Sequence, residues 1–218
     1  YDLYLMFDNF GVITSNWYLN IKSRQLQIKV EKFVSSKLSP PLVAKELKEC
    51  SLKVGKIEES NESLSIKVNE KVKEIRASYL IDEQKLEIAF KFPDHYPLTP
   101  IQVVGISRIG VTESKWKSWI LSTQKVITTM NGSIVDSLEL FSKNVDLQFS
   151  GFEECAICYY VLNAIDRKLP TKQCPTCKYK FHSTCLYKWF KSSGNNTCPM
   201  CRGAFDFTTR STHTQQVR

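Results

Sequence analysis

Residues 155–201 read CAICYYVLNAIDRKLPTKQCPTCKYKFHSTCLYKWFKSSGNNTCPMC and contain seven of the eight cysteines of this 218-residue chain. They form three Cys-x2-Cys pairs and one His-x2-Cys pair. Two intervening residues let a tight turn aim both side chains at one ion, and zinc takes four such ligands in a tetrahedron. An odd number of clustered cysteines fits disulfide pairing poorly, and the chain shows no secretion signal. The pattern predicts metal binding; the plain alternative is buried cysteines beside one hydrogen-bonded histidine.

Four ligand pairs supply two complete sites, and a site closed by four protein ligands is structural rather than catalytic. Sequential use of the pairs would give two separate knuckles. Alternating use would join the first pair to the third and the second to the fourth, locking about 50 residues that have little other core. The spacing leaves both schemes open. The candidate ligands are Cys155, Cys158, Cys174, Cys177, His182, Cys185, Cys198 and Cys201.

Length and composition bound the rest of the molecule. The length fits one large or two small domains, and 42% hydrophobic with 24% charged residues excludes wholesale disorder. No apolar run is long enough for a membrane span. The formal net charge is +8, and residues 151–218 carry most of the basic excess. A nucleic-acid module is therefore one hypothesis, which ranks last because the cysteine-rich part lacks interleaved exposed aromatic residues.

Residue periodicity predicts an α+β fold. Helical spacing covers residues 1–38, the motif Leu38-Ser39-Pro40-Pro41 ends that segment, and a further helix follows over about 40–49. Alternation then predicts an antiparallel meander. Its strands are expected at 64–68, 75–81 and 85–92 and from 101, with a turn at 82–84; helices follow from 113 to about 130 and from 133 to about 144. A short joint at Ser150-Gly151 marks a domain boundary.

The sequence Tyr96-Pro97-Leu98-Thr99-Pro100, between strands and ahead of long helices, resembles the turn of the RWD domain, whose fold is related to ubiquitin-conjugating enzymes (E2s). An E2 has its catalytic cysteine after this turn. No cysteine lies between Pro100 and Cys155, and Cys50 precedes the sheet. The resemblance therefore implies a binding module without a catalytic nucleophile.

The cysteine-rich part resembles a RING finger of the C4HC3 ligand order. That resemblance implies the alternating scheme: Cys155, Cys158, His182 and Cys185 hold one structural Zn²⁺, and Cys174, Cys177, Cys198 and Cys201 hold another. It also implies E2 contacts through Ile157, Trp189 and Pro199, with Arg202 bonding both the E2 and its ubiquitin. No residue of the chain is itself expected to be catalytic.

A PHD finger, a peptide reader with the same ligand order, is the alternative. Such fingers usually carry an aromatic residue two positions before the seventh ligand, and this chain has Asn196 there. A non-catalytic reader or scaffold therefore fits less well than a RING-type E3 ubiquitin transferase.

Together, NGSIVDSL (131–138) and GFEECAICY (151–159) resemble the C-terminal region of the listerin family of RING-type E3 ubiquitin ligases. The resemblance implies the end of a helical-repeat region over 1–38, an RWD-like domain over 39–150, a RING finger over 151–205 and a flexible tail over 206–218. It implies ubiquitylation of stalled nascent chains in the cytoplasm, with the RWD-like part on the large ribosomal subunit. Expected partners are an E2, ubiquitin, that subunit with its stalled chain, and a nascent-chain quality-control cofactor, with no membrane and a monomeric chain.

Overall fold

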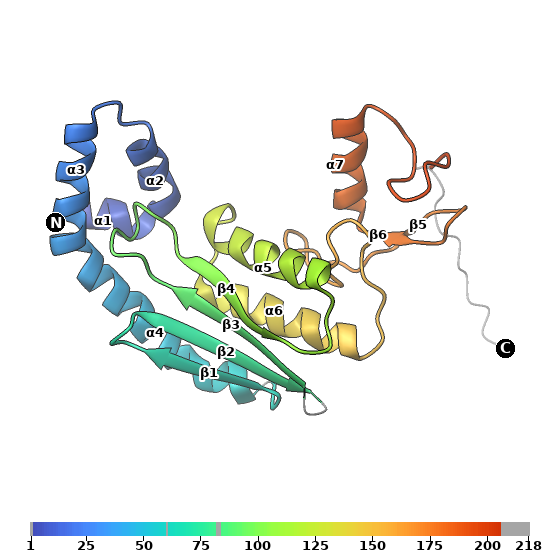
Figure 1. Ribbon diagram of the computed structural model, residues 1–218, viewed down its shortest axis with the longest axis horizontal. Coiled ribbons are helices and arrows are strands. Elements are labelled where there is room, and N and C mark those ends of the chain that lie inside the picture. The colour runs from blue at the N-terminus through green and yellow to red at the C-terminus, as the bar shows by residue number, and fades with distance from the viewer. Residues whose placement is uncertain (1, 60, 82–83, 206–218) are drawn as a thin grey trace. The chain divides into compact units, whose positions relative to one another are not determined.

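The computed structural model describes residues 2–59, 61–81 and 84–205 and confirms the α+β class (Figure 1). The chain divides into two compact units, residues 1–150 and 151–218, called here the N-terminal unit and the cysteine-rich unit. The elements of the N-terminal unit are α1 (Asp2–Asn9), α2 (Gly11–Leu19), α3 (Arg24–Phe33), η1 (Val34–Leu38), α4 (Ser39–Glu59), β1 (Leu64–Asn69), β2 (Glu74–Ile81), β3 (Gln84–Lys91), β4 (Gln102–Arg108), α5 (Glu113–Thr128) and α6 (Ile134–Phe149). Those of the cysteine-rich unit are β5 (Lys172–Gln173), β6 (Lys180–Phe181) and α7 (Ser183–Ser193). Most of the expected turn at 82–84 and the whole expected tail at 206–218 lie outside the described residues.

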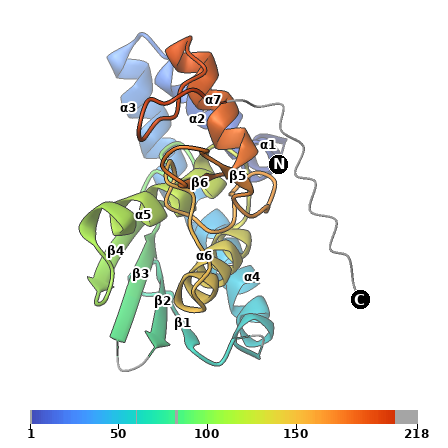
Figure 2. The same ribbon diagram turned by 90° about the vertical axis from the view of Figure 1, so that its right-hand side faces the viewer.

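The four strands form an antiparallel sheet in the order β1-β2-β3-β4, as the alternation predicts. Ile75 pairs with Phe90 and Ala77 with Ile88, and all four side chains are fully buried. They lie on the face that α4, α5 and α6 cover, whereas no described helix of the N-terminal unit covers the other face (Figures 1 and 2). A half-buried meander therefore explains the period-two pattern.

Aromatic side chains hold α5 and α6 against the sheet. The rings of Trp116, Trp119 and Phe141 are all buried and lie with centroids 6.2–6.5 Å apart. At Gly105 in β4, an added Cβ would lie 2.3 Å from Trp116 Nε1, so this strand position has room only for glycine. α6 starts with a capping box in which Ser133 and Asp136 satisfy each other's backbone N–H groups.

The predicted helix end at Leu38–Pro41 is wrong, and the helix predicted over about 40–49 is present but longer than expected. The helical path continues through the π-turn η1 into α4, which runs to Glu59. The Ser39 N–H bonds the Val34 carbonyl five residues back. This widened turn makes room for the Pro40 ring, which would collide with a carbonyl in a regular α-helix. The prolines therefore change the helical pitch instead of ending the helix.

The helical lead-in and the Tyr-Pro turn share one apolar cluster. Its buried members come from α1, η1, α4 and the turn, and they are Phe7, Val34, Leu38, Leu42 and Leu98. Ser15 on α2 also donates to the Leu98 carbonyl over 2.8 Å. The lead-in and the sheet therefore belong to one packed body. Among the helices of the described residues, none has the length and apolar character that crossing a bilayer demands.

Candidate metal centre

Three turns of the cysteine-rich unit share one backbone geometry, and each carries a Cys-x2-Cys pair. In the turn of Cys198, its N–H donates to the Gly203 carbonyl over 2.8 Å and its carbonyl accepts from Arg202 N–H over 2.9 Å. Arg202 lies in the left-handed region at φ 59°. The turns of Cys155 and Cys174 have the same two hydrogen bonds and a left-handed residue at the same place. This knuckle directs both sulfurs of a pair to one side of the chain.

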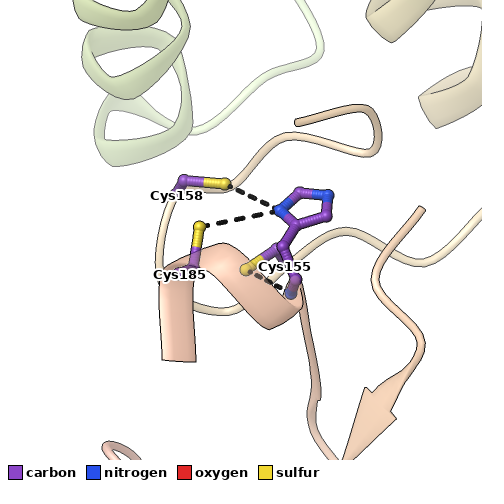
Figure 3. Close-up of side chains that lie close together, drawn as sticks. Cys155, Cys158 and Cys185 are labelled. Atoms are coloured by element: carbon purple, nitrogen blue, oxygen red, sulfur yellow. Dashed lines mark hydrogen bonds between the residues drawn. The ribbon is translucent and has the colours of Figure 1, made fainter. Parts of the chain in front are cut away.

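The first cluster consists of Cys155, Cys158, His182 and Cys185, whose ligand atoms all lie within 4.8 Å of one another. The sulfurs of Cys158 and Cys185 lie 3.4 Å and 3.7 Å from His182 Nδ1. Figure 3 shows both sulfurs directed at one nitrogen of the imidazole ring. The other ring nitrogen, Nε2, lies 3.0 Å from the Val161 carbonyl, which can only accept. Nε2 therefore carries the proton, and Nδ1 presents its lone pair to the cluster.

The second cluster consists of Cys174, Cys177, Cys198 and Cys201. The sulfur–sulfur distances are 3.7 Å between Cys174 and Cys201 and 3.6 Å between Cys177 and Cys198. These separations are far too long for disulfides, and the cysteines are free. The structure thus brings the eight candidate ligands together in the alternating grouping.

Both clusters fit zinc. Two sulfurs about 2.3 Å from one ion at tetrahedral angles lie about 3.8 Å apart, and a sulfur and a nitrogen lie slightly closer. The distances of 3.4–3.7 Å within the clusters match these edges. The ligands are a large part of what holds the unit together, because half of its buried cluster consists of ligand cysteines. Four ligands around each centre leave no open position, so the arrangement is structural rather than hydrolytic.

Crowding of thiols in the first cluster lowers the pKa of one ligand and raises the pKa of its neighbour. Hydrogen bonds from the Cys158 and Cys185 thiols hold the pKa of Cys155 far below its usual range. The same contact with Cys155 raises the pKa of Cys158, since two adjacent thiolates repel each other. A divalent cation would relieve this repulsion and bind all the thiolates at once.

The four predicted E2-contact residues lie around these clusters. Ile157 is half-buried within the first knuckle, and Pro199 is half-buried within the last. Trp189 lies on α7 one turn after Cys185, is 36% exposed, and its indole N–H donates to the Thr197 carbonyl over 3.1 Å. Arg202 is exposed and follows the last ligand. Their role in E2 binding stays a prediction.

Sequence reasoning missed two residues that contact the first cluster. Val161 orients His182 through its carbonyl, and the buried Asn163 side chain lies 3.6 Å from the Cys185 sulfur. Neither position carries a sequence signal, because a backbone carbonyl has no residue preference and a lone asparagine in a loop is common.

The N-terminal unit offers no cysteine beside its Tyr-Pro turn. A cavity of about 280 Å³ lies next to Tyr96 and Pro97, and none of its lining residues is a cysteine. Cys50 is buried on α4, and burial raises the pKa of its thiol to about 11. A buried, protonated thiol is a poor nucleophile.

Comparisons with known families agree with this architecture. Residues 153–202 match the family model described as "Ring finger domain", residues 64–148 match "Ubiquitin conjugating domain-like", and residues 3–51 match "LTN1 family HEAT repeat region". The repeat model thus ends inside α4. Fold and metal centre define the class: an α+β domain related to ubiquitin-conjugating enzymes, followed by a RING finger.

Comparison with individual relatives shows which family within this class the chain belongs to. The chain is 62% identical over 205 residues to the E3 ubiquitin-protein ligase listerin of Saccharomyces cerevisiae, covering 94% of this chain and 13% of that protein. The listerin of Schizosaccharomyces pombe is 44% identical over 88% of this chain and 12% of its own length, and that of Mus musculus is 37% identical over 87% and 10%. The chain belongs to the listerin family. It spans about an eighth of the length of the curated relatives it matches.

Proposed function

We propose that the chain acts as the ubiquitin-transferring part of a RING-type E3 ligase, with one Zn²⁺ in each cluster. The observation that carries the proposal is the interleaving of two closed four-ligand clusters in a RING finger. The ions would supply cohesion and no reaction step. The protein's own contribution is positioning: a RING holds an E2–ubiquitin thioester in one orientation so that a substrate amine can attack it.

Four side chains are assigned to this contact. Ile157, Trp189 and Pro199 offer apolar area to the E2, and the guanidinium of Arg202 offers several hydrogen-bond donors in one plane. Among the described residues Arg202 has no side-chain partner, so its donors are available to the E2 and ubiquitin. Arg202 is exposed and lies in the left-handed region directly after the last ligand.

The test is ubiquitin discharge from a panel of loaded E2s. Arg202→Ala should slow discharge about tenfold or more, because hydrogen bonds to charged groups are worth about 1.5–3 kcal/mol. Arg167→Ala is the matched control, since Arg167 is also exposed and left-handed, at φ 53°. The wild-type chain should hold two zinc ions per molecule, and so should both variants. Lack of discharge with every E2 would contradict the ligase assignment, and zinc loss from Arg202→Ala would contradict its role as a clamp.

The N-terminal unit is proposed to dock and not to catalyse. The absence of a cysteine at its cavity and the buried thiol of Cys50 support this. The ribosome is the partner that the family resemblance implies, specifically the large subunit with a stalled nascent chain, together with a nascent-chain quality-control cofactor. The chain would act there as a monomer in the cytoplasm.

The uncovered face of the sheet offers charge for such docking. Its cations are the exposed Lys67, Arg76, Lys85 and Lys91, and its anions are the buried Glu74 and Glu87. Ion pairs tie Lys85 to Glu87 over 2.6 Å and Lys91 to Glu74 over 3.8 Å, and Arg76 contacts both glutamates. The excess of cations favours a phosphate-rich surface and predicts salt-sensitive binding.

Sedimentation with purified large ribosomal subunits tests the docking. The wild-type chain should co-sediment at low salt and lose affinity as salt rises. Lys67→Glu with Lys91→Glu should abolish binding, while Lys143→Glu, on the exposed side of α6, should not. An affinity for the subunit that changes neither with salt nor with the double substitution would contradict docking through this face.

Two other functions have less support. A peptide reader would need an aromatic residue where Asn196 lies exposed, and the matching family model describes a RING finger. The hypothesis of a nucleic-acid module rested on the positive net charge. Binding two Zn²⁺ by seven thiolates lowers that charge by about three, so the hypothesis has less support.

A further inference from the structure

The cysteine-rich unit contains a fourth knuckle that has no cysteine. Asn163 N–H donates to the Lys168 carbonyl over 3.0 Å, and the Asn163 carbonyl accepts from Arg167 N–H over 3.0 Å. Arg167 lies at φ 53°, at the place that Tyr159, Lys178 and Arg202 occupy in the cysteine knuckles. Asn163 therefore occupies the position of the first cysteine of a pair.

The side chain of Asn163 also reproduces the bonds of a ligand sulfur. In the last knuckle the Cys198 sulfur accepts from the N–H two residues on, that of Met200, over 3.4 Å. In the turn of Asn163 the amide Oδ1 accepts from Ile165 N–H over 2.8 Å and from Asp166 N–H over 3.4 Å. The amide oxygen thus closes this turn without a metal.

The other half of the amide points to the first cluster. Asn163 is 5% exposed, and its Nδ2 donates to Thr184 Oγ1 over 2.9 Å and to the Cys185 sulfur over 3.6 Å. Two residues earlier, the Val161 carbonyl accepts from His182 Nε2. One short segment therefore contacts two of the four ligands of this cluster, His182 and Cys185.

We propose that Asn163 is a positioning residue for the first zinc site, where its amide N–H stabilises the Cys185 thiolate, slows zinc release and protects that sulfur from electrophiles. A hydrogen bond to a ligand sulfur withdraws electron density that would otherwise attack an electrophile, and partners of metal ligands typically change metal affinity about 10–100-fold. The proposal rests on the zinc binding proposed above. It makes the two zinc sites unequal, because the amide of Asn163 contacts a ligand of the first cluster.

The variant Asn163→Asp tests the hydrogen bond to Cys185 without removing the hydrogen bonds that close the turn. The aspartate keeps an oxygen acceptor for the N–H groups of Ile165 and Asp166 but removes the Nδ2 donor. Asn196→Asp is the matched control, since Asn196 is exposed in the same unit and the substitution adds the same charge. Thr184→Val removes the other acceptor of Nδ2 and leaves the contact with Cys185 in place.

Two measurements on the full 218-residue chain test the proposal. Zinc release to a metallochromic chelator should be about 10-fold or more faster from one of the two sites in Asn163→Asp, and unchanged in both controls. Mass spectrometry after N-ethylmaleimide treatment should show Cys185 modified earlier than in wild type, with Cys198 unchanged. Equal behaviour of Asn163→Asp and Asn196→Asp would overturn the proposal, and so would simultaneous modification of all cysteines, which indicates unfolding. A wild-type chain without zinc would instead refute the proposed zinc binding itself.

Discussion

Replacing Trp189 by alanine tests whether the exposed side of α7 binds an E2. Trp189 is 36% exposed, which for a side chain that buries up to about 250 Å² leaves about 90 Å² for a partner. At about 25 cal/mol per Å², losing this area costs about 2 kcal/mol, or about 30-fold in Kd for the E2. The rest of the side chain is covered within the unit, where its indole N–H donates to the Thr197 carbonyl over 3.1 Å, so folding must be checked beside affinity.

The assay is a titration of an active E2 with wild type, Trp189→Ala and Trp189→Phe, with zinc content measured in parallel. Phenylalanine keeps most of the apolar area and loses only the hydrogen bond to Thr197, so its Kd should rise only about 2–5-fold. Unchanged affinity in Trp189→Ala, with both zinc ions retained, would refute the contact. A loss in Trp189→Phe equal to that in alanine would refute the area argument and assign the effect to the hydrogen bond.

Three further results are expected. Removing metal with EDTA should unfold the cysteine-rich unit and leave the N-terminal unit folded, which amide NMR spectra would show; a spectrum unchanged by EDTA would contradict this. Gly105→Ala should lower the free energy of unfolding in urea by about 1–3 kcal/mol, because the new Cβ would lie 2.3 Å from Trp116 Nε1, whereas Gly55→Ala, with nothing within 4 Å, should not destabilise the chain. Burial raises the pKa of the Glu46 carboxyl above its usual 4.5, so the contribution of Glu46 to stability is lost as pH rises from 4.5 through the raised pKa. Glu46→Gln keeps an acceptor for the Tyr96 hydroxyl and should melt higher than wild type at neutral pH but equally at about pH 4; a difference that does not depend on pH would contradict this.

The strands and ligand pairs were predictable because each depends on local spacing. Alternation along Lys85–Phe92 arises because β3 turns Leu86, Ile88 and Phe90 to the face that the helices cover, and two residues between cysteines follow from the reach of one turn. The grouping of the pairs depends on how segments far apart in the sequence meet. Spacing leaves both groupings possible, and the alternating one came from a family resemblance.

Other features depend on contacts that no pattern encodes. The π-turn before Pro40 depends on a hydrogen bond from Ser39 to Val34, and a proline pair ordinarily predicts a helix end. The contact of Asn163 could not be predicted from the sequence either. Its turn contains neither glycine nor proline, and its amide contacts Cys185, which is far away in the sequence. Both features depend on specific hydrogen bonds that residue types and spacing do not encode.

The continuous helix α4 fixes the angle at which the sheet lies about the helix axis. Near its start, Leu42 packs with the helical lead-in, and near its end the Glu58 carboxylate accepts the Ile66 N–H of β1 over 2.6 Å. A helix turns about 100° and advances about 1.5 Å with each residue. The number of residues between Leu42 and Glu58 therefore sets the azimuth of the sheet about the helix axis. Deleting one residue there would swing the docking face by more than a quarter of a circle, even though every side chain that forms it would remain.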